Sequence, residues 1–332
     1  MTKLLLLLGF YFLGYSQKNS ADITVYKKSI LTIIDSKSTI EVLADGFKVA
    51  EGPLWDSKSE RLLFSDVKQN KIFTWDSIHG VQDYISPSGS TGYAPKPLKS
   101  NKGSNGLAFN ALGEIILCQV SDRKISSIKN NRTEKPKFKT LVDNYNGKRF
   151  NGPNDLAISK SGAIFFTDPP YGFFVNGKNE ENSYREIRFN GVYKLSPNGK
   201  ISVITSSLSL PNGSAISNDE KYIYINNAGK KDPKIIKLDI ESSKETLFFD
   251  GKALSKKYKG AFDGLKVHSS GNIFTTGPNG ILIISPSGDL LATINYGKGV
   301  TNCNFDTNEE YLYVTGFNDI SRIKLKWKEE TF

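Results

Sequence analysis

Six residues with oxygen-bearing side chains recur at the same place in six successive repeats of the chain. Each precedes a short stretch of alternating apolar residues, then a turn and an apolar run. These lead residues are Glu51, Asn105, Asn154, Asn212, Asp263 and Asn302. If the repeats are arranged in a ring, the six lead residues converge near its axis. A ring of carboxylate and carboxamide oxygens is the ligand set that a hard cation such as Ca²⁺ prefers.

The chemistry of the lead residues suits a divalent cation. Glu51 and Asp263 are ionisable, and the four asparagines are neutral oxygen donors. Mg²⁺, Mn²⁺ or Zn²⁺ could take the place of Ca²⁺. Asn-Gly and Asp-Gly are also common turn signals, which is the alternative interpretation. We favour the metal ring because Glu51 is a poor turn residue, and because Asn154 and Asn302 occur without a following glycine.

The elements that position these residues are predicted to be short strands. The lead residues are spaced roughly 40 to 60 residues apart, a period typical of propeller blades with four antiparallel strands. Apolar runs such as Leu62–Ser65, Ile164–Thr167 and Tyr222–Ile225 predict strands, and Ser161-Gly162 is one of the turns that precede them. No segment shows a sustained helical period. The sequence therefore predicts an all-β, six-bladed β-propeller.

The two ends of the chain are predicted to meet in one blade. The sixth repeat runs out of chain soon after Leu325, whereas residues 38–44 read as a strand without a blade of its own. We infer that this strand completes the last blade, because closing the ring removes exposed sheet edges. Residues 17–332 then form a single domain, with loops 86–103 and 173–190 as insertions.

The N-terminus has the pattern of a secretory signal peptide. Lys3 precedes an apolar stretch over residues 4–13, and the small-residue site Gly14-Tyr15-Ser16 comes before Gln17. We expect cleavage after residue 16 and a periplasmic or extracellular protein. The apolar run is too short to span a membrane, and no later segment is apolar enough.

Composition and charge indicate a soluble globular protein. Of the 332 residues, 38% are hydrophobic and 23% charged, and the formal net charge is +10. The basic residues occur in dispersed pieces such as Lys230-Lys231, which favours a solvated basic surface over nucleic-acid binding. Export would permit a disulfide between Cys118 and Cys303, but both lie in apolar runs, which fits buried free thiols better.

Several motifs taken together resemble the gluconolactonase and regucalcin (senescence marker protein) family. The resemblance covers about residues 45–325. The motifs are Glu51-Gly52-Pro53-Leu54-Trp55, Asn154-Asp155-Leu156, Thr167-Asp168-Pro169-Pro170-Tyr171-Gly172, Leu210-Pro211-Asn212-Gly213, Asp263-Gly264-Leu265 and Thr301-Asn302-Cys303. The resemblance implies a six-bladed propeller with one essential divalent metal, usually calcium. It also implies hydrolysis of sugar lactones or, in relatives, of other lactones or organophosphates.

The resemblance implies roles for particular residues. The metal ligands would be Glu51, Asn212 and Asp263, with Asn154 as a further ligand or a substrate contact. The metal would polarise the lactone carbonyl, while Asp263 would activate or orient a water molecule as the catalytic residue. The predicted substrate contacts are Asn105, Gln119, Arg149, Asn154 and Tyr171. Two of these have plainer alternatives: Arg149 as a loop surface charge and Tyr171 as a packing residue.

The sequence also departs from the family pattern. Bacterial gluconolactonases of this type usually have a histidine where Leu107 follows Asn105-Gly106, and Glu-His where Gln119-Val120 follows Cys118. His79 and His268 do not replace these histidines by position. We therefore expect a small lactone or sugar-derived substrate of altered identity. The main alternative is a non-catalytic, calcium-stabilised binding propeller, whereas no side chain supports a lyase or a strictosidine-synthase-like enzyme.

Overall fold

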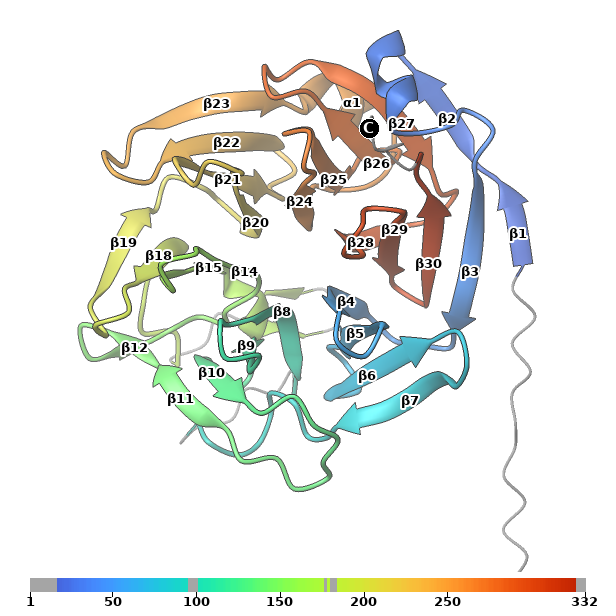
Figure 1. Ribbon diagram of the computed structural model, residues 1–332. Coiled ribbons are helices and arrows are strands. Elements are labelled where there is room, and N and C mark those ends of the chain that lie inside the picture. The colour runs from blue at the N-terminus through green and yellow to red at the C-terminus, as the bar shows by residue number, and fades with distance from the viewer. Residues whose placement is uncertain (1–16, 95–100, 176–177, 180–183, 327–332) are drawn as a thin grey trace, which may run out of the picture.

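Six small β-sheets are arranged in a ring in the computed structural model (Figure 1), which describes residues 17–94, 101–175, 178–179 and 184–326. The six-bladed β-propeller predicted from the repeat spacing is confirmed. The proposed leader, residues 1–16, lies outside the described residues.

Each blade is an antiparallel sheet of four core strands that follow one another outward from the axis. Blade 1 contains β4 (Ala50–Asp56), β5 (Arg61–Asp66), β6 (Lys71–Asp76) and β7 (Gly80–Ile85). Blade 2 contains β8 (Ser104–Phe109), β9 (Ile115–Gln119), β10 (Lys124–Ile128) and β11 (Lys139–Val142). Blade 3 contains β14 (Leu156–Ile158), β15 (Ile164–Asp168), β18 (Gly191–Leu195) and β19 (Ile201–Thr205). Blade 4 contains β20 (Pro211–Ile216), β21 (Tyr222–Asn227), β22 (Lys234–Asp239) and β23 (Glu245–Asp250). Blade 5 contains β24 (Leu265–Val267), β25 (Ile273–Gly277), β26 (Gly280–Ile284) and β27 (Leu290–Asn295). Blade 6 contains β28 (Val300–Phe305), β29 (Tyr311–Gly316), β30 (Asp319–Lys324) and β3 (Thr39–Asp45).

The N-terminal segment closes the ring from outside (Figure 1). The strand that the sequence places at residues 38–44 is β3, which pairs antiparallel with β30 so that Ile40 lies opposite Ile323. Two further strands were not predicted. The strand β1 (Gln17–Ser20) pairs with β3, and β2 (Asp22–Val25) pairs with β27 of blade 5. The segment thus joins blades 5 and 6 and covers both of their outer edges.

The remaining elements are short and lie in connections. Two 3₁₀ helices are η1 (Lys28–Thr32) and η2 (Pro170–Phe173), and the α-helix is α1 (Lys252–Lys257). Two hairpins are formed by β12 (Asn144–Tyr145) with β13 (Lys148–Arg149) and by β16 (Phe174–Val175) with β17 (Lys178–Asn179). Within the described ranges, no helix has the length and apolar character needed to cross a membrane.

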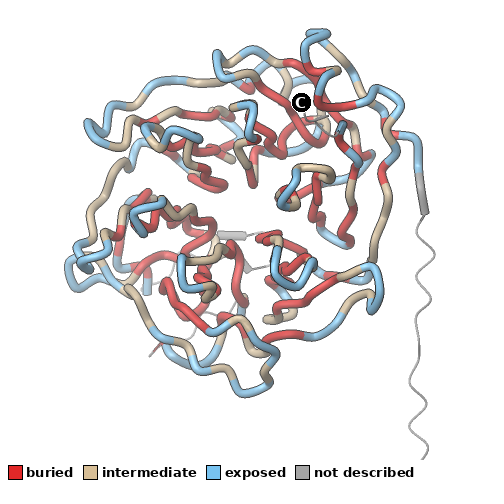
Figure 2. Tube along the Cα trace, in the orientation of Figure 1, coloured by how far each residue is buried: buried red, intermediate tan, exposed pale blue. Residues whose placement is uncertain are grey.

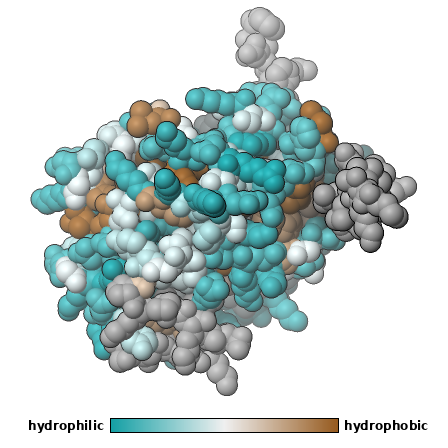
Figure 3. Space-filling view, turned by 90° about the horizontal axis from the view of Figure 1, so that it is seen from below, coloured by the Kyte–Doolittle hydropathy of each residue, from teal (hydrophilic) through white to brown (hydrophobic). Residues whose placement is uncertain are grey.

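Apolar side chains from neighbouring blades pack against one another around the ring. Tyr224 of blade 4 packs with Leu265 and Ile273 of blade 5, and Trp55 of blade 1 stacks on Tyr313 of blade 6 with ring centroids 5.1 Å apart. Figure 2 shows burial concentrated in the inner strands and exposure in the outer turns. On the face seen in Figure 3, hydrophobic side chains form separate small patches on a mainly hydrophilic surface.

The cysteines and histidines lie where the sequence suggests. Cys118 and Cys303 are both buried and free, as expected.

His79 lies in an outer turn beside Asp76, with 3.0 Å between its Nδ1 and the Asp76 Oδ1. His268 follows β24 and is buried, and its Nε2 lies 3.1 Å from the Glu309 Oε2. Each histidine is therefore held by a carboxylate of its own blade or of the next one.

Candidate active site

The lead residues lie on the innermost strands, where the strand pairing is irregular. Glu51, Asn105, Asn212 and Asn302 fall within β4, β8, β20 and β28, close to shifts in register that mark β-bulges. Asn154 and Asp263 come just before β14 and β24. The alternative that the lead dipeptides are simple turns is therefore wrong for the four that lie within strands.

Glycines that follow lead residues allow neighbouring inner strands to approach closely. A Cβ on Gly213 would lie only 2.2 Å from the backbone oxygen of Asp263, and a Cβ on Gly52 equally close to that of Asn105. The Gly213 amide donates a hydrogen bond to the Asp263 oxygen at 2.9 Å. These glycines therefore set the distance between blades at the axis.

Polar side chains on second strands fix the backbone of the next lead residue. The Ser65 hydroxyl donates to the Asn105 oxygen at 2.8 Å, and the Thr167 hydroxyl to the Asn212 oxygen at 2.7 Å. The Asn226 amide does the same for Asp263 at 2.6 Å. Because these groups are buried, each bond satisfies a carbonyl that water does not reach.

Side chains from four blades meet at the axis. The Asp263 carboxyl is within hydrogen-bonding reach of both Glu51 and Asn212. The Asn302 amide donates to the Glu51 Oε2 at 3.1 Å. The Asn212 amide also lies 3.4 Å from the Tyr171 hydroxyl, to which it donates. The structure thus brings together three of the predicted metal ligands and one predicted substrate contact.

Burial makes the two carboxyl groups hard to ionise together. Desolvation raises the pKa of Glu51 to about 7, and the nearby charge of Asp155 adds to this. Burial also raises the pKa of Asp263 well above its ordinary value, with the charge of Glu51 as the second cause. Lys266 on β24 lowers the pKa of Glu51, but only as a smaller opposing effect. Two buried carboxyl groups in contact favour a shared proton or a bound cation.

The residues present fit a hard divalent cation. Within the described ranges, no three or more His, Cys, Asp and Glu side chains group so as to hold a metal. A site at the axis would therefore draw on both carboxylate and amide oxygens, which Glu51, Asp263 and Asn212 offer. Asn212 uses its amide nitrogen toward Tyr171, which leaves its carbonyl oxygen for a ligand. The Asn105 Oδ1 is buried and accepts no hydrogen bond. Carboxylate and amide oxygens of this kind suit Ca²⁺ better than softer metals.

Asn154 is buried at the start of blade 3. Its backbone nitrogen donates to the Thr167 oxygen at 2.9 Å, and its oxygen accepts from Gly106 at 2.8 Å. These bonds tie the residue to blades 2 and 3, next to β20 of blade 4. Its position agrees with either of its predicted roles, as a further ligand or as a substrate contact.

Sequence and fold comparisons identify relatives of this chain. Residues 49–318 match the family model described as the SMP-30/Gluconolactonase/LRE-like region. A gluconolactonase of Zymomonas mobilis is 34% identical over 312 residues, which cover 92% of this chain and 86% of that enzyme. The chain belongs to the SMP-30/gluconolactonase/LRE-like family.

Solved structures related to this family share the fold. A gluconolactonase from Xanthomonas campestris superposes with a TM-score of 0.79 at 23% identity, covering 94% of this chain and 99% of that one. The calcium-binding protein regucalcin from Agrobacterium tumefaciens gives a TM-score of 0.64 at 15% identity, covering 86% and 94%. At these identities the similarity establishes the propeller fold alone.

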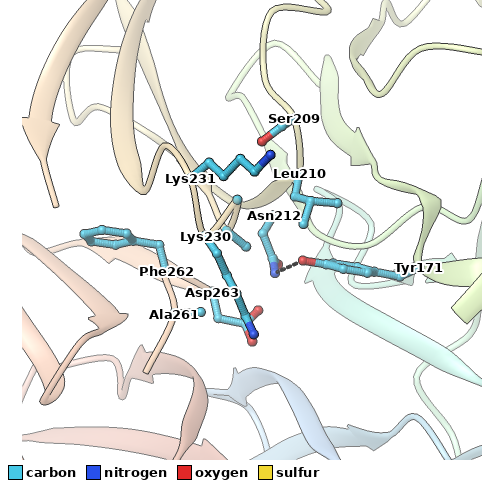
Figure 4. A pocket seen from close by; sticks show the side chains of 11 residues that line it. Tyr171, Ser209, Leu210, Asn212, Lys230, Lys231, Ala261, Phe262 and Asp263 are labelled. Atoms are coloured by element: carbon cyan, nitrogen blue, oxygen red, sulfur yellow. Dashed lines mark hydrogen bonds between the residues drawn. The ribbon is translucent and has the colours of Figure 1, made fainter. Parts of the chain in front are cut away.

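A pocket of about 470 Å³ opens beside Asp263 (Figure 4). Tyr171, Asn212 and Asp263 line it together with Lys230 and Lys231 from the loop between β21 and β22. The volume falls within the range of small-molecule sites, and the pocket contains one carboxylate and one amide of the candidate metal site. Asn212 and Asp263 are therefore shared by the candidate metal site and the pocket.

An insertion loop positions Tyr171. Tyr171 belongs to η2, and its backbone oxygen accepts a hydrogen bond from the Lys102 ammonium at 2.5 Å. Burial raises the pKa of the phenol, and the charges of Asp263 and Glu51 raise it further. The hydroxyl therefore stays protonated and can donate a hydrogen bond into the pocket, which goes beyond the alternative of a packing residue.

Two predicted substrate contacts lie elsewhere. Gln119 is fully buried, its amide donates to the Ser88 oxygen at 2.8 Å, and its Oε1 accepts from Ser126 at 2.6 Å. The Gln119 nitrogen thus holds the insertion loop and its oxygen is occupied by β10 of the same blade, so its role as a substrate contact stays a prediction. The guanidinium of Arg149 lies 4.0 Å from Asp143 and packs over Tyr93 rather than against the lead residues. These contacts favour the alternative interpretation of Arg149, in which it is a surface charge on a loop and not a substrate contact.

Two features of the site were missed from the sequence. Asp155 is a buried carboxylate whose Oδ2 accepts from the Ser214 nitrogen at 2.9 Å, and burial raises its pKa. A signal was present, because Asn154 is followed by an acidic residue where four of the other five repeats have glycine. The second feature is Lys230-Lys231, which the sequence suggested only as part of a dispersed basic surface. No local pattern placed these lysines in a pocket.

Proposed function

We propose that the protein is a metal-dependent lactonase of the gluconolactonase type. Family membership and the similarity to the Zymomonas mobilis enzyme support lactone hydrolysis. We further propose one divalent cation, Ca²⁺ by preference, at Glu51, Asn212 and Asp263, with Asn154 as a further ligand or substrate contact. The observation that carries this proposal is the buried contact between the carboxyl groups of Glu51 and Asp263.

The chain's own residues supply binding and proton handling. A cation held there would provide Lewis acidity toward the lactone carbonyl. Asp263 orients the attacking water by accepting its hydrogen bond, since a carboxylate beside a cation is a weak base. Tyr171 keeps its proton and donates a hydrogen bond to a substrate oxygen. The unpartnered Oδ1 of Asn105 offers an acceptor for a substrate hydroxyl.

The identity of the lactone is proposed to differ from glucono-lactone. Leu107 and Val120 stand where family enzymes usually have histidines, and both side chains are buried. Gln119 is committed to Ser88 and Ser126. Among the described residues, the polar groups at the site include the lead residues, Asp155, Tyr171 and the pocket lysines.

Substitution of the two carboxylates tests the proposal. Asp263→Asn and Glu51→Gln keep the side-chain size while removing one negative charge each. We expect kcat/KM on a panel of sugar lactones and simple lactones to fall at least about 100-fold for either variant. Asp83→Asn is the control, because Asp83 is an exposed residue of an outer strand that pairs with Lys71. Wild-type activity in both site variants would overturn the assignment.

A second outcome would change the function rather than the site. If the wild-type protein binds Ca²⁺ but hydrolyses no member of the panel, the calcium-stabilised binding propeller replaces the lactonase.

We also propose that the protein is exported and that its leader is removed after residue 16. The support is the n-region, apolar run and small-residue site of the first 16 residues. Expression in a bacterial host followed by mass spectrometry of the periplasmic fraction tests this. The expected N-terminal residue is Gln17, and a cytoplasmic protein that retains residues 1–16 would contradict the proposal.

A further inference from the structure

Two adjacent lysines form part of the pocket wall that adjoins the candidate metal site. Lys230 and Lys231 belong to the loop between β21 and β22 and line the same pocket as Tyr171, Asn212 and Asp263. Figure 4 shows both side chains extending from this loop, whereas Tyr171 enters the pocket from another side. Two positive charges are thus placed beside the reacting centre.

The loop that carries the lysines is held firmly. The Ala228 nitrogen donates to the Leu210 oxygen at 2.9 Å, which fixes one end of the loop to β20. The Asn227 amide donates to the Asp232 oxygen at 2.7 Å, and the Asp232 nitrogen donates to the Gly229 oxygen at 3.0 Å. The backbone of the lysine pair is therefore preorganised, although the side chains themselves are exposed.

The nearest acidic residue of the loop does not neutralise these lysines. Asp232 pairs with Lys234 at 2.8 Å and with Lys252 at 3.2 Å. Among the described residues, neither Lys230 nor Lys231 forms an ion pair. The one carboxylate in the pocket lining is Asp263, and a divalent cation bound to Glu51 and Asp263 would balance the charges of both. The pocket then carries the net positive charge of the two lysines.

We propose that Lys230 and Lys231 select lactones that carry an anionic group, either a carboxylate or a phosphate, away from the lactone carbonyl. The carbonyl would face Asp263 and Tyr171, and the anionic group would reach the lysines. A pocket of about 470 Å³ has room for a substituted sugar lactone. Ammonium groups bind carboxylate and phosphate oxygens through charge-assisted hydrogen bonds. This inference rests on the proposed lactonase function.

Paired substrates test the inference. The hydrolysis of 6-phosphogluconolactone and of a glucarolactone, which carries a free carboxylate, is compared with that of neutral glucono-δ-lactone. We expect the wild-type protein to prefer at least one anionic lactone. In the double variant Lys230→Met/Lys231→Met, kcat/KM for the preferred lactone should fall about 10-fold or more, mainly through KM, while the neutral lactone changes less than about 2-fold. The anionic lactone whose kcat/KM falls more in the double variant shows whether the lysines select phosphate or carboxylate.

A matched variant and a change of salt concentration separate direct contact with the lysines from a long-range effect of net charge. Lys200→Met removes an exposed lysine from the turn between β18 and β19, and it should leave the preference unchanged. Raising the salt concentration should reduce the preference of the wild-type protein, because exposed charges are screened. An unaltered ratio of anionic to neutral turnover in the double variant would overturn the inference and leave the lactonase proposal intact.

Binding of the product acids keeps the inference testable without turnover. Calorimetry compares 6-phosphogluconate and glucarate with gluconate, in the presence of Ca²⁺. Tighter binding of either acid that carries a second anionic group, lost in the double variant, supports selection by the lysines. Equal binding of all three acids contradicts it, whether or not any lactone is hydrolysed. Absence of turnover on every lactone contradicts the lactonase proposal alone.

Discussion

The carboxyl groups of Glu51 and Asp263 lie within hydrogen-bonding reach of each other at the axis of the propeller, although they come from blades 1 and 5. Burial raises the pKa of both groups, and the charge of Glu51 raises the pKa of Asp263 further. The pair is unfavourable when both groups are ionised and no cation is present. A divalent cation would remove this cost and join two blades that are not adjacent.

The stability of the metal-free protein should therefore depend on pH. Glu51 has a pKa of about 7 in the folded protein and an ordinary value of 4.5. Its contribution to stability is fully present below pH 4.5 and is lost as the pH rises through 7, because the unfolded chain releases the proton first. We expect Tm in EDTA to fall between pH 5 and pH 7.5. Added Ca²⁺ should raise Tm more at pH 7.5 than at pH 5, whereas an equal increase at both values would contradict the shared site.

Gly213 should tolerate no side chain at the axis. In Gly213→Ala the new Cβ would meet the Asp263 oxygen at 2.2 Å, so the inner strands of blades 4 and 5 must separate. We expect a loss of about 2–4 kcal/mol in the free energy of unfolding, measured with urea, together with weaker Ca²⁺ binding. Gly199→Ala is the comparison, because Gly199 has open space and only a positive φ of 83°. It should lose about 1 kcal/mol and bind Ca²⁺ normally.

The hydroxyl of Thr167 should matter more than an exposed hydroxyl of the same type. Thr167→Val keeps the shape but removes the bond to the Asn212 oxygen, leaving a buried carbonyl unsatisfied. Chemical denaturation should show a loss of about 1–3 kcal/mol. Thr246→Val, which removes an exposed bond to the Lys237 oxygen, should change stability by less than about 0.5 kcal/mol. Similar losses in the two variants would refute the role assigned to the buried bond.

Tyr171 is expected to act through its hydroxyl. Tyr171→Phe keeps the ring but removes the group that lies 3.4 Å from the Asn212 amide. We expect kcat/KM on the best lactone to fall about 10-fold with little change in Tm, because a hydrogen bond to the substrate is lost. Tyr222→Phe on β21 is the control, since the Tyr222 ring packs against Lys237. Unchanged kinetics would leave Tyr171 as a packing residue.

The repeated pattern predicts the fold because its residues act locally. Alternating apolar residues and turns repeat in every blade, and the unpartnered strand near residues 38–44 indicated how the ring closes. The strands β1 and β2 were not predicted. Their pairing with β3 and β27 depends on contacts between distant parts of the chain.

The sequence predicted where the lead residues lie, but not how their neighbours are arranged. Glu51, Asn212 and Asp263 meet because equivalent strand positions meet in a ring. Gln119 lies at the end of β9, the second strand of blade 2, and its side chain donates a hydrogen bond to Ser88. Ser88 belongs to an insertion loop, and the repeated pattern does not predict the path of that loop. The pocket lysines were missed for the same reason, since a loop between strands carries them into the pocket wall.

Lactone hydrolysis before and after metal removal tests the central claim most directly. The protein is treated with EDTA, dialysed and assayed on the lactone panel, and then titrated with Ca²⁺ while binding is followed by calorimetry. Turnover should be lost on depletion and restored as about one equivalent of Ca²⁺ binds, and neither should occur in Asp263→Asn. Full activity in the depleted protein, or no Ca²⁺ binding by the wild type, would contradict the account.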